Sequence, residues 1–106
     1  MEWYNKLYVG SSVGKRSRIL QYKISNRKMH PVCYLIVMVC KPGSLLEIIP
    51  SSCLLQEAYP TDDLSIIGIA GSRQEARELA AKILSDVYEA RHDLDVKAFL
   101  YGGGSL

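Results

Sequence analysis

The chain has 106 residues, of which 48% are hydrophobic and 23% charged, and its formal net charge is +2. A chain of this length forms one domain around one core, and its composition excludes a disordered or fibrous protein. The longest apolar run, residues 32–40, has nine residues, whereas a membrane-spanning helix needs about twenty. The first residues, MEWYNK, show no basic region followed by an apolar stretch, so we expect no secretory signal, a cytoplasmic location and no membrane partner.

Charge is unevenly distributed along the chain. Residues 1–41 contain eight basic residues and one acidic residue, a formal charge of +7, whereas residues 42–106 contain five basic and ten acidic residues, a charge of −5. This asymmetry predicts either a polyanionic partner for the basic half or an acidic protein partner, which includes a second copy of the chain.

The first two predicted elements are a strand and a helix. Residues 3–9 are aromatic and β-branched and precede a glycine, which predicts a strand. Residues 13–28 are ambiguous, because apolar residues alternate over 20–24 as in a strand. The abundance of Lys, Arg, Leu and Gln and the absence of a hairpin dipeptide favour a helix instead, starting at a Ser11 or Ser12 cap.

The middle of the chain predicts two strands and a short helix. Residues 32–40 are almost continuously apolar, as expected for a strand that is covered on both faces at the centre of a sheet. Residues 45–49 follow a Pro-Gly turn and predict a short strand, with a helical turn as the alternative. Residues 53–59 predict a short helix capped by Ser51 or Ser52.

The clearest predicted element is a helix over residues 72–91. It follows a second buried strand, residues 64–70, and it begins with a capping box in which Ser72 accepts a backbone hydrogen bond while Glu75 reaches back to the cap. Seven apolar residues then recur at spacings of three and four, which predicts a surface helix lying on a sheet. They are Ala76, Leu79, Ala80, Ile83, Leu84, Val87 and Tyr88.

This order of elements predicts a small single-domain α/β fold over residues 1–101. We expect a sheet of about four to five strands with the two buried strands in its core, packed by the long helix and the basic helix on one or both faces. Residues 95–101 predict an additional edge strand or a loosely docked segment. The Gly-rich residues 102–106 predict a flexible tail.

One glycine-containing turn resembles a phosphate-binding loop in its position between a strand and a helix. Three residues separate Gly10 from Gly14 where the P-loop has four, and Arg16 follows Lys15 where the P-loop has a magnesium-binding Ser or Thr. The sequence therefore does not predict an NTPase. Backbone donors at the helix start, beside Lys15 and Arg16, could still hold a phosphate or sulfate, with an ordinary turn as the alternative.

A second glycine-containing turn follows the strand at residues 64–70. It contains Gly68 and Gly71 but lacks the GxGxxG pattern. Turns at the carboxyl ends of parallel strands often contact ligands. Glu75 in the first turn of the following helix would repel an anion, so a tight turn is the alternative explanation for Gly71.

Metal and catalytic sites are not predicted. The three cysteines, Cys33, Cys40 and Cys53, are odd in number and form no CxxC motif, so we expect free thiols. His30 and Cys33 form an HxxC pair, which supplies too few ligands for zinc. Asp62-Asp63 are adjacent acids in a polar turn and do not define an acid-base pair. No GxSxG motif occurs, and although a Cys or Ser nucleophile with a histidine base remains open, we expect no enzyme activity and no cofactor.

The basic segment carries the leading functional hypothesis. Six basic residues and no acid occur in fourteen positions; they are Lys15, Arg16, Arg18, Lys23, Arg27 and Lys28. In a helix, Arg16, Lys23 and Arg27 would lie near one line, an arrangement suited to phosphate contacts, with a solvated basic face as the alternative. We therefore predict a non-enzymatic binding or adaptor domain that contacts nucleic acid or an acidic protein. The alternative is a small-ligand or protein-interaction module, homodimers included, that uses the turns at Gly10–Lys15 and Gly68–Ser72.

Overall fold

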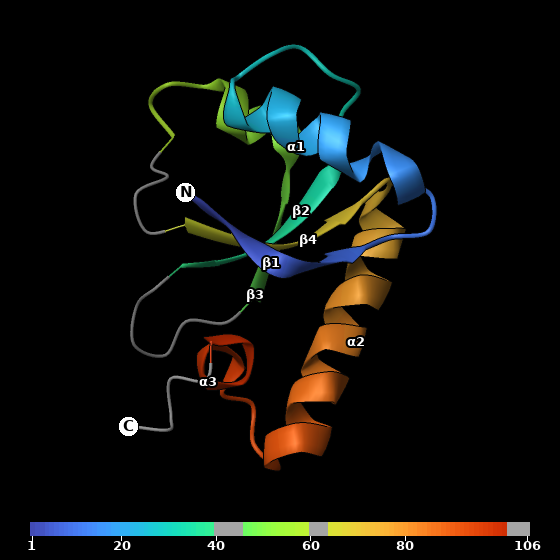
Figure 1. The fold of residues 1–106 in the computed structure, drawn as a ribbon, viewed down its shortest axis with the longest axis vertical. Helices are drawn as coiled ribbons and strands as arrows, with labels where there is room; N and C mark the ends of the chain where they lie inside the picture. Colours follow the sequence, from blue (N-terminus) through green and yellow to red (C-terminus); the bar gives the residue numbers. More distant parts are fainter. Residues whose placement is uncertain (40–45, 60–63, 102–106) are drawn as a thin grey trace.

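The computed structural model describes residues 1–39, 46–59 and 64–101 (Figure 1). Its elements, in chain order, are β1 (Glu2–Val9), the 3₁₀ helix η1 (Gly14–Arg16), α1 (Ser17–Ser25), β2 (Tyr34–Val39), β3 (Leu46–Pro50), the 3₁₀ helix η2 (Ser51–Leu55), β4 (Leu64–Ala70), α2 (Arg73–Arg91) and α3 (Val96–Tyr101). The predicted α/β fold with a sheet and packed helices is confirmed. Cys40, the Asp62-Asp63 pair and the predicted tail lie outside the described residues.

The four strands form one mixed sheet in the order β1-β4-β2-β3. The outer strand β1 runs parallel to β4, whereas β2 runs antiparallel to both of its neighbours. The pairing of β1 with β4 shifts register between Trp3 and Tyr8, where β1 carries extra residues. Because β1 and β4 are parallel neighbours, their carboxyl ends, and the two glycine-containing turns that follow them, meet at the same edge of the sheet.

Helices cover both faces of this sheet, which explains the continuous apolar sequence of β2. Leu35 and Val37 belong to a core cluster that includes residues of α1 and η2, and Ile36 and Met38 belong to a second cluster with residues of α2 and α3. Figure 1 shows α1 and α2 on opposite sides of the sheet. The prediction that residues 32–40 form a central strand covered on both faces is confirmed, with the strand starting at Tyr34.

The basic segment is helical, as favoured by its composition, but the helix is shorter than predicted. The prediction of a helix to residue 28 is wrong in its end point, because α1 stops at Ser25 and Arg27 adopts a left-handed backbone with φ 53°. The predicted serine cap is also wrong, because α1 follows η1 directly with Arg16 at its N-cap and no side-chain cap. Leu20 and Ile24 anchor α1 in the core, since they are spaced to face the sheet together.

The strand β3 forms as predicted, but the helix predicted over residues 53–59 is wrong. A 3₁₀ helix, η2, occupies residues 51–55 instead, and neither serine at its start caps it. The Ser51 hydroxyl accepts a hydrogen bond from the Cys33 backbone N–H at 3.0 Å. A tertiary contact to the strand β2 region has therefore taken the side chain that local sequence assigned to a cap.

The helix α2 confirms its prediction, with one change in the capping box. The Ser72 hydroxyl accepts a hydrogen bond from the Glu75 backbone N–H at 3.1 Å, as predicted. The Glu75 side chain does not complete the box; it accepts a hydrogen bond from the Gly71 N–H at 2.8 Å. Most of the apolar stripe is buried or half-buried, but Tyr88 is exposed.

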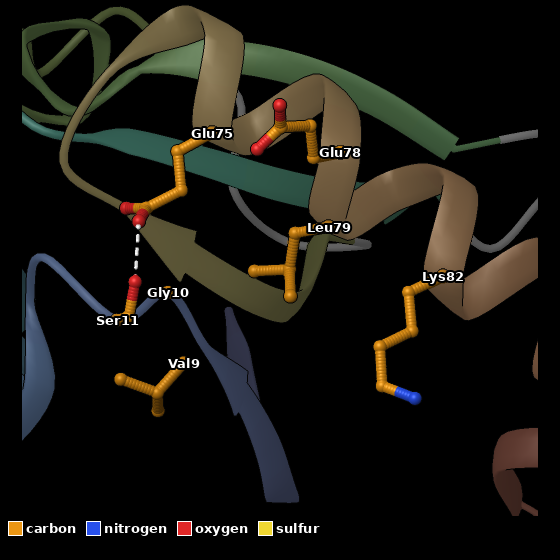
Figure 2. Close-up of a pocket in the computed structure, with 7 residues that line it drawn as sticks. All are labelled: Val9, Gly10, Ser11, Glu75, Glu78, Leu79 and Lys82. Atoms are coloured by element: carbon orange, nitrogen blue, oxygen red, sulfur yellow. Dashed lines mark hydrogen bonds between the residues drawn. The ribbon is translucent and has the colours of Figure 1, made fainter.

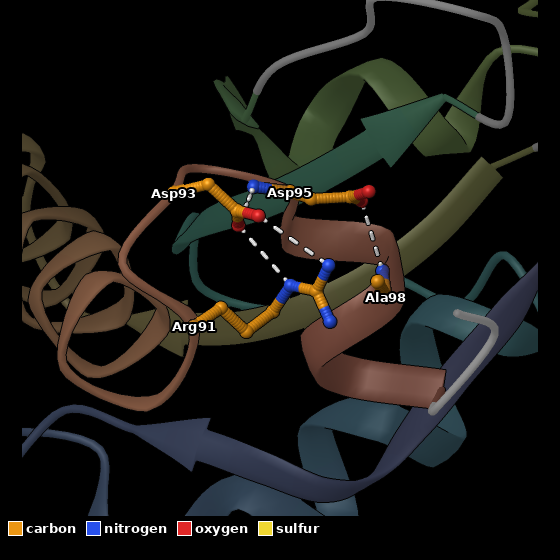
Figure 3. Close-up of polar contacts among 4 residues, drawn as sticks. All are labelled: Arg91, Asp93, Asp95 and Ala98. Carbon is orange, nitrogen blue, oxygen red and sulfur yellow. Dashed lines mark hydrogen bonds and ion pairs between the residues drawn. The ribbon is translucent and has the colours of Figure 1, made fainter. Parts of the chain in front are cut away.

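Val96–Tyr101 form the helix α3, so the prediction of an edge strand over residues 95–101 is wrong. The Asp95 carboxylate accepts a hydrogen bond from the Ala98 N–H at 3.0 Å, an N-cap contact that starts α3 (Figure 3). Asp93 accepts from the Asp95 N–H at 3.0 Å and pairs with Arg91 at 3.1 Å. Val96 and Leu100 are buried in the same core cluster as α2, so the segment is docked rather than loose.

Candidate functional site

The two glycine-containing turns are in direct contact at the carboxyl ends of β1 and β4. The Gly10 N–H donates to the Ile69 carbonyl at 2.8 Å. A Cβ at Gly10 would collide with the Glu75 carboxylate, and one at Gly71 would collide with the Ser12 hydroxyl. The close approach of these turns explains both glycines, since each lacks the atom that would separate them.

The Glu75 carboxylate occupies the junction between these turns. It accepts hydrogen bonds from the Ser12 N–H at 3.1 Å, the Ser12 hydroxyl at 2.6 Å and the Gly71 N–H at 2.8 Å, and a longer one from the Ser11 hydroxyl at 3.4 Å. The Gly71 hydrogen bond, followed by those from the serines, holds the pKa of the Glu75 carboxyl below its ordinary value. We call this set of Ser11, Ser12, Gly71 and Glu75 the Glu75 network.

The Glu75 network uses backbone donors that we expected to be available to a bound anion at the turns. The backbone N–H groups of Ser12 and Gly71, which could have held a phosphate, already donate to a carboxylate of the same chain. Gly14 has φ 50°, and a Cβ there would meet nothing within 4 Å, so this glycine serves the backbone turn. Gly68 lies inside β4, where a Cβ would press on Ile36 Cδ1 at 3.0 Å, so close packing against β2 accounts for a glycine at this position.

An open hollow of about 220 Å³ lies beside the Glu75 network, between the end of β1 and the first turns of α2 (Figure 2). Its walls are Val9, Gly10, Ser11, Glu75, Glu78, Leu79 and Lys82. The Glu78 carboxylate accepts a hydrogen bond from Gln74 at 3.1 Å, and Lys82 lies 3.6 Å from the Asp86 carboxylate. The hollow therefore offers both signs of charge against an apolar wall, in a volume suited to a very small molecule.

The six predicted basic residues lie on η1, on α1 and in the residues that directly follow α1. We call them the basic surface: Lys15 and Arg16 on η1, Arg18 and Lys23 on α1, and Arg27 and Lys28 directly after α1. All are exposed except Lys23, which is half-buried. Because the helix ends at Ser25, Arg27 does not continue a helical line from Arg16 and Lys23, contrary to the predicted spacing.

Two members of the basic surface are held by backbone carbonyls. Arg16 donates to the Ser12 carbonyl at 2.7 Å, and Arg27 donates to the Leu54 carbonyl of η2 at 3.3 Å. Lys28 Nζ lies 6.0 Å from the centre of the Tyr22 ring. Within the described part of the chain, no member of the basic surface forms an ion pair; the two ion pairs found there join Lys82 to Asp86 and Arg91 to Asp93.

Apolar side chains are exposed in the same segment as the basic surface. Ile19 and Tyr22 on α1 are 51% and 55% exposed, and Met29 and Val32, in the connection to β2, are 82% and 55% exposed. Single exposed apolar residues are common on soluble proteins. Because these residues lie among or directly after the cations, within residues 15–32, this surface is both basic and apolar.

A partly buried polar network joins His30 to η2. His30 Nδ1 lies 2.8 Å from the Lys28 carbonyl, which can only accept, so Nδ1 carries a proton. In the neutral imidazole, Nε2 then accepts from the Ser51 hydroxyl at 2.8 Å. Ser51 is completely buried, so this pair has the spacing of a nucleophile and its base but no access for a substrate. It fastens the segment after α1 to η2.

The described cysteines are free, and one of them is buried. Cys33 and Cys53 are free thiols, as predicted, and burial raises the pKa of the Cys33 thiol, which keeps it in the unreactive protonated form. Among residues 1–39, 46–59 and 64–101, no three His, Cys, Asp or Glu side chains gather closely enough to hold a metal ion.

The fold is that of a small α/β domain with a mixed four-stranded sheet. None of the described helices combines the length and apolar character required to cross a membrane. No family model matches the chain, and neither the curated proteins nor the solved structures include a significant match.

Sequence reasoning missed two residues that organise these regions. Glu75 was expected to complete a local capping box, and Ser51 was expected to cap a helix; both instead contact segments far away in the chain. A serine or glutamate near a helix start carries no sequence signal that separates a local from a distant partner.

Proposed function

We propose that this domain is a non-enzymatic binding module whose basic surface contacts a polyanion, of which nucleic acid is the leading candidate. The observation that carries the proposal is the location of the ion pairs among the described residues. The described ion pairs, Lys82 with Asp86 and Arg91 with Asp93, both lie in the acidic half, whereas the basic surface pairs with no described acid.

A basic surface that forms no ion pair with described acids has a physical consequence for binding. Each cation that contacts a phosphate releases counterions from the nucleic acid, so affinity falls with added salt in proportion to the number of contacts. Lys15, Arg18 and Lys28 are exposed, and their side chains make no hydrogen bond or ion pair with described residues. Lys15 and Arg18 are therefore available to a partner without loss of a hydrogen bond or ion pair to described residues, and Lys28 would exchange only its contact with the Tyr22 ring.

The experiment compares two triple variants with matched charge changes. Binding of a labelled mixed-sequence nucleic acid is measured by fluorescence anisotropy from about 50 to about 300 mM salt. Lys15→Ala, Arg18→Ala and Lys28→Ala together should weaken binding and reduce the slope of log affinity against log salt by about two to three. The control triple Arg77→Ala, Lys82→Ala and Lys97→Ala removes the same charge from the acidic half and should leave the slope unchanged.

Two results would overturn the proposal: no binding at the lowest salt, or equal loss in both triples, which would indicate a response to net charge alone. Light scattering at each salt concentration accompanies the binding measurement. Association of the +7 half of one chain with the −5 half of another would also weaken with salt, and the measured mass separates this from nucleic-acid binding.

A second candidate function is small-ligand binding at the hollow between β1 and α2. The observation in its favour is the open volume of about 220 Å³ beside the carboxyl end of β1, a strand with a parallel neighbour; ligand sites often lie at the carboxyl ends of parallel strands. Glu78 and Lys82 would contact a small zwitterion. Chemical shift changes confined to this hollow on addition of amino acids, and absent in a Glu78→Ala and Lys82→Ala double variant, would support this function.

A further inference from the structure

The exposed side of α1 carries the aromatic ring of Tyr22. Leu20 and Ile24 point into the core, and at about 100° per residue Tyr22 lies on the opposite side of the helix, with Arg18 one turn before it. Tyr22 is 55% exposed. The ring therefore stands on the outward face of the basic surface, between Arg18 on the helix and Lys28, whose Nζ lies 6.0 Å from the ring centre.

Within the described part of the chain, no hydrogen bond is found for the Tyr22 side chain. Trp3 donates to Ser25 at 2.8 Å, Tyr8 donates to Asp86 at 2.9 Å, and the Tyr34 ring packs beneath the Arg73 guanidinium at 5.0 Å. At Tyr22, by contrast, it is the backbone carbonyl that accepts from the Asn26 side chain, at 2.8 Å. Its ring contact in the described part of the chain is the one with Lys28.

From this placement we infer that the polyanion is a single-stranded nucleic acid and that Tyr22 stacks on one of its bases, with Arg18 and Lys28 contacting the neighbouring phosphates. This inference rests on the proposed function and specifies its ligand. Single strands expose base faces, and a groove of cations with an interposed aromatic ring is the usual way to bind them without sequence preference. In a duplex those faces are stacked, so a tyrosine ring there gains nothing beyond the phosphate contacts.

Ile19, one turn from Tyr22 on α1 and 51% exposed, extends the apolar surface next to the ring. Residues three apart on a helix are neighbours, so Ile19 can cover the edge of the stacked base or its sugar. An acidic peptide with apolar side chains would also suit cations beside Ile19. The flat ring flanked by two cations matches the alternation of base and phosphate, which favours the nucleic acid.

The test uses three ligands of equal length, about twelve nucleotides: a single strand, a duplex, and a single strand whose bases are removed. Tyr22→Ala should weaken binding of the intact single strand about 5- to 150-fold, the range for loss of one stacked base. It should leave duplex and abasic binding unchanged. Tyr22→Phe should restore binding, because phenylalanine keeps the ring. Tyr88→Ala, which removes a tyrosine that is also 55% exposed but lies on α2, is the matched control.

A measurement on the unaltered protein keeps the inference testable if a Tyr22 variant fails to fold. Stacking a base on Tyr22 should shift its ring protons upfield in the NMR spectrum when the single strand is added, and the duplex should not. The absence of this shift on saturating single strand would overturn the inference whatever the variants show.

The outcomes separate this inference from the proposed function. Equal binding of single strand and duplex with no effect of Tyr22→Ala would overturn the stacking inference and leave polyanion binding intact. Preferential, Tyr22-dependent binding of an acidic peptide such as oligoglutamate with interspersed leucines would replace nucleic acid by an acidic protein partner. No binding of any of these ligands at low salt would overturn both.

Discussion

Glu75 offers the sharpest test of how the fold is held together, because its carboxylate joins turns that are about sixty residues apart in the chain. Glu75→Ala removes the acceptor for four donors in the Glu75 network. A hydrogen bond to a charged group contributes about 1.5–3 kcal/mol net. The carboxylate is half-exposed, so the freed donors can reach water, and we expect a loss of about 2 kcal/mol in the free energy of unfolding for the whole network. In a domain of this size this lowers Tm by about 8 °C.

The loss should depend on pH in a defined direction. The pKa of Glu75 is lowered in the folded protein by its hydrogen bonds, so the carboxylate stabilises the fold fully above the unfolded pKa of about 4.3. As pH falls through the lower folded pKa, the carboxyl becomes protonated and the stabilisation disappears. The difference in stability between the wild-type protein and Glu75→Ala should therefore be constant near neutral pH and shrink below about pH 4.

Urea unfolding followed by circular dichroism at several pH values measures this difference. Glu78→Ala is the control, since Glu78 lies one turn further along α2 and accepts a single hydrogen bond from Gln74. A loss in Glu75→Ala no larger than in Glu78→Ala, or one that persists at acidic pH, would refute the reasoning. Gly10→Ala adds an independent check: its Cβ would meet the Glu75 carboxylate, so its cost should decrease sharply in the Glu75→Ala background.

Two further predictions concern buried polar contacts. Ser51→Ala should lower the free energy of unfolding in urea by about 1–3 kcal/mol, because it leaves the Cys33 N–H and His30 Nε2 without their hydrogen-bond partner. Ser52→Ala, which alters the half-buried neighbour, should lower it far less. Equal losses in the two variants would contradict the role given to Ser51. Burial and then the hydrogen bond to Asp86 raise the pKa of Tyr8 to about 12. The protonated Tyr8 hydroxyl therefore contributes fully to the stability of the fold below about pH 10, and this contribution is lost as pH rises from 10 toward 12. Spectrophotometric titration should show a tyrosinate component near pH 12 that is absent in Tyr8→Phe, and its persistence in that variant would assign it to another tyrosine.

The sequence by itself determined the elements whose burial follows a regular period. The strands β2 and β4 were predicted from their apolar runs, and α2 from a stripe that recurs every three or four residues. A face that is buried along its whole length requires an apolar residue at each position on that face, so the sequence shows the period of the element. The sequence also gives the positions of the basic residues at 15–28, and the structure describes five of these six side chains as exposed and one as half-buried.

Only the tertiary structure decided which partners the short polar side chains take. Glu75 and Ser51 carry local capping signals, yet each contacts a segment brought close by the sheet, because parallel pairing of β1 with β4 and antiparallel pairing of β2 with β3 place those segments together. Residues 95–101 give a second example: the Asp95 cap and the burial of Val96 and Leu100 against α2 stabilise a helix where we expected an edge strand or a loosely docked segment. Hydrogen-bond partners depend on distances across the fold, and a one-dimensional pattern does not contain those distances.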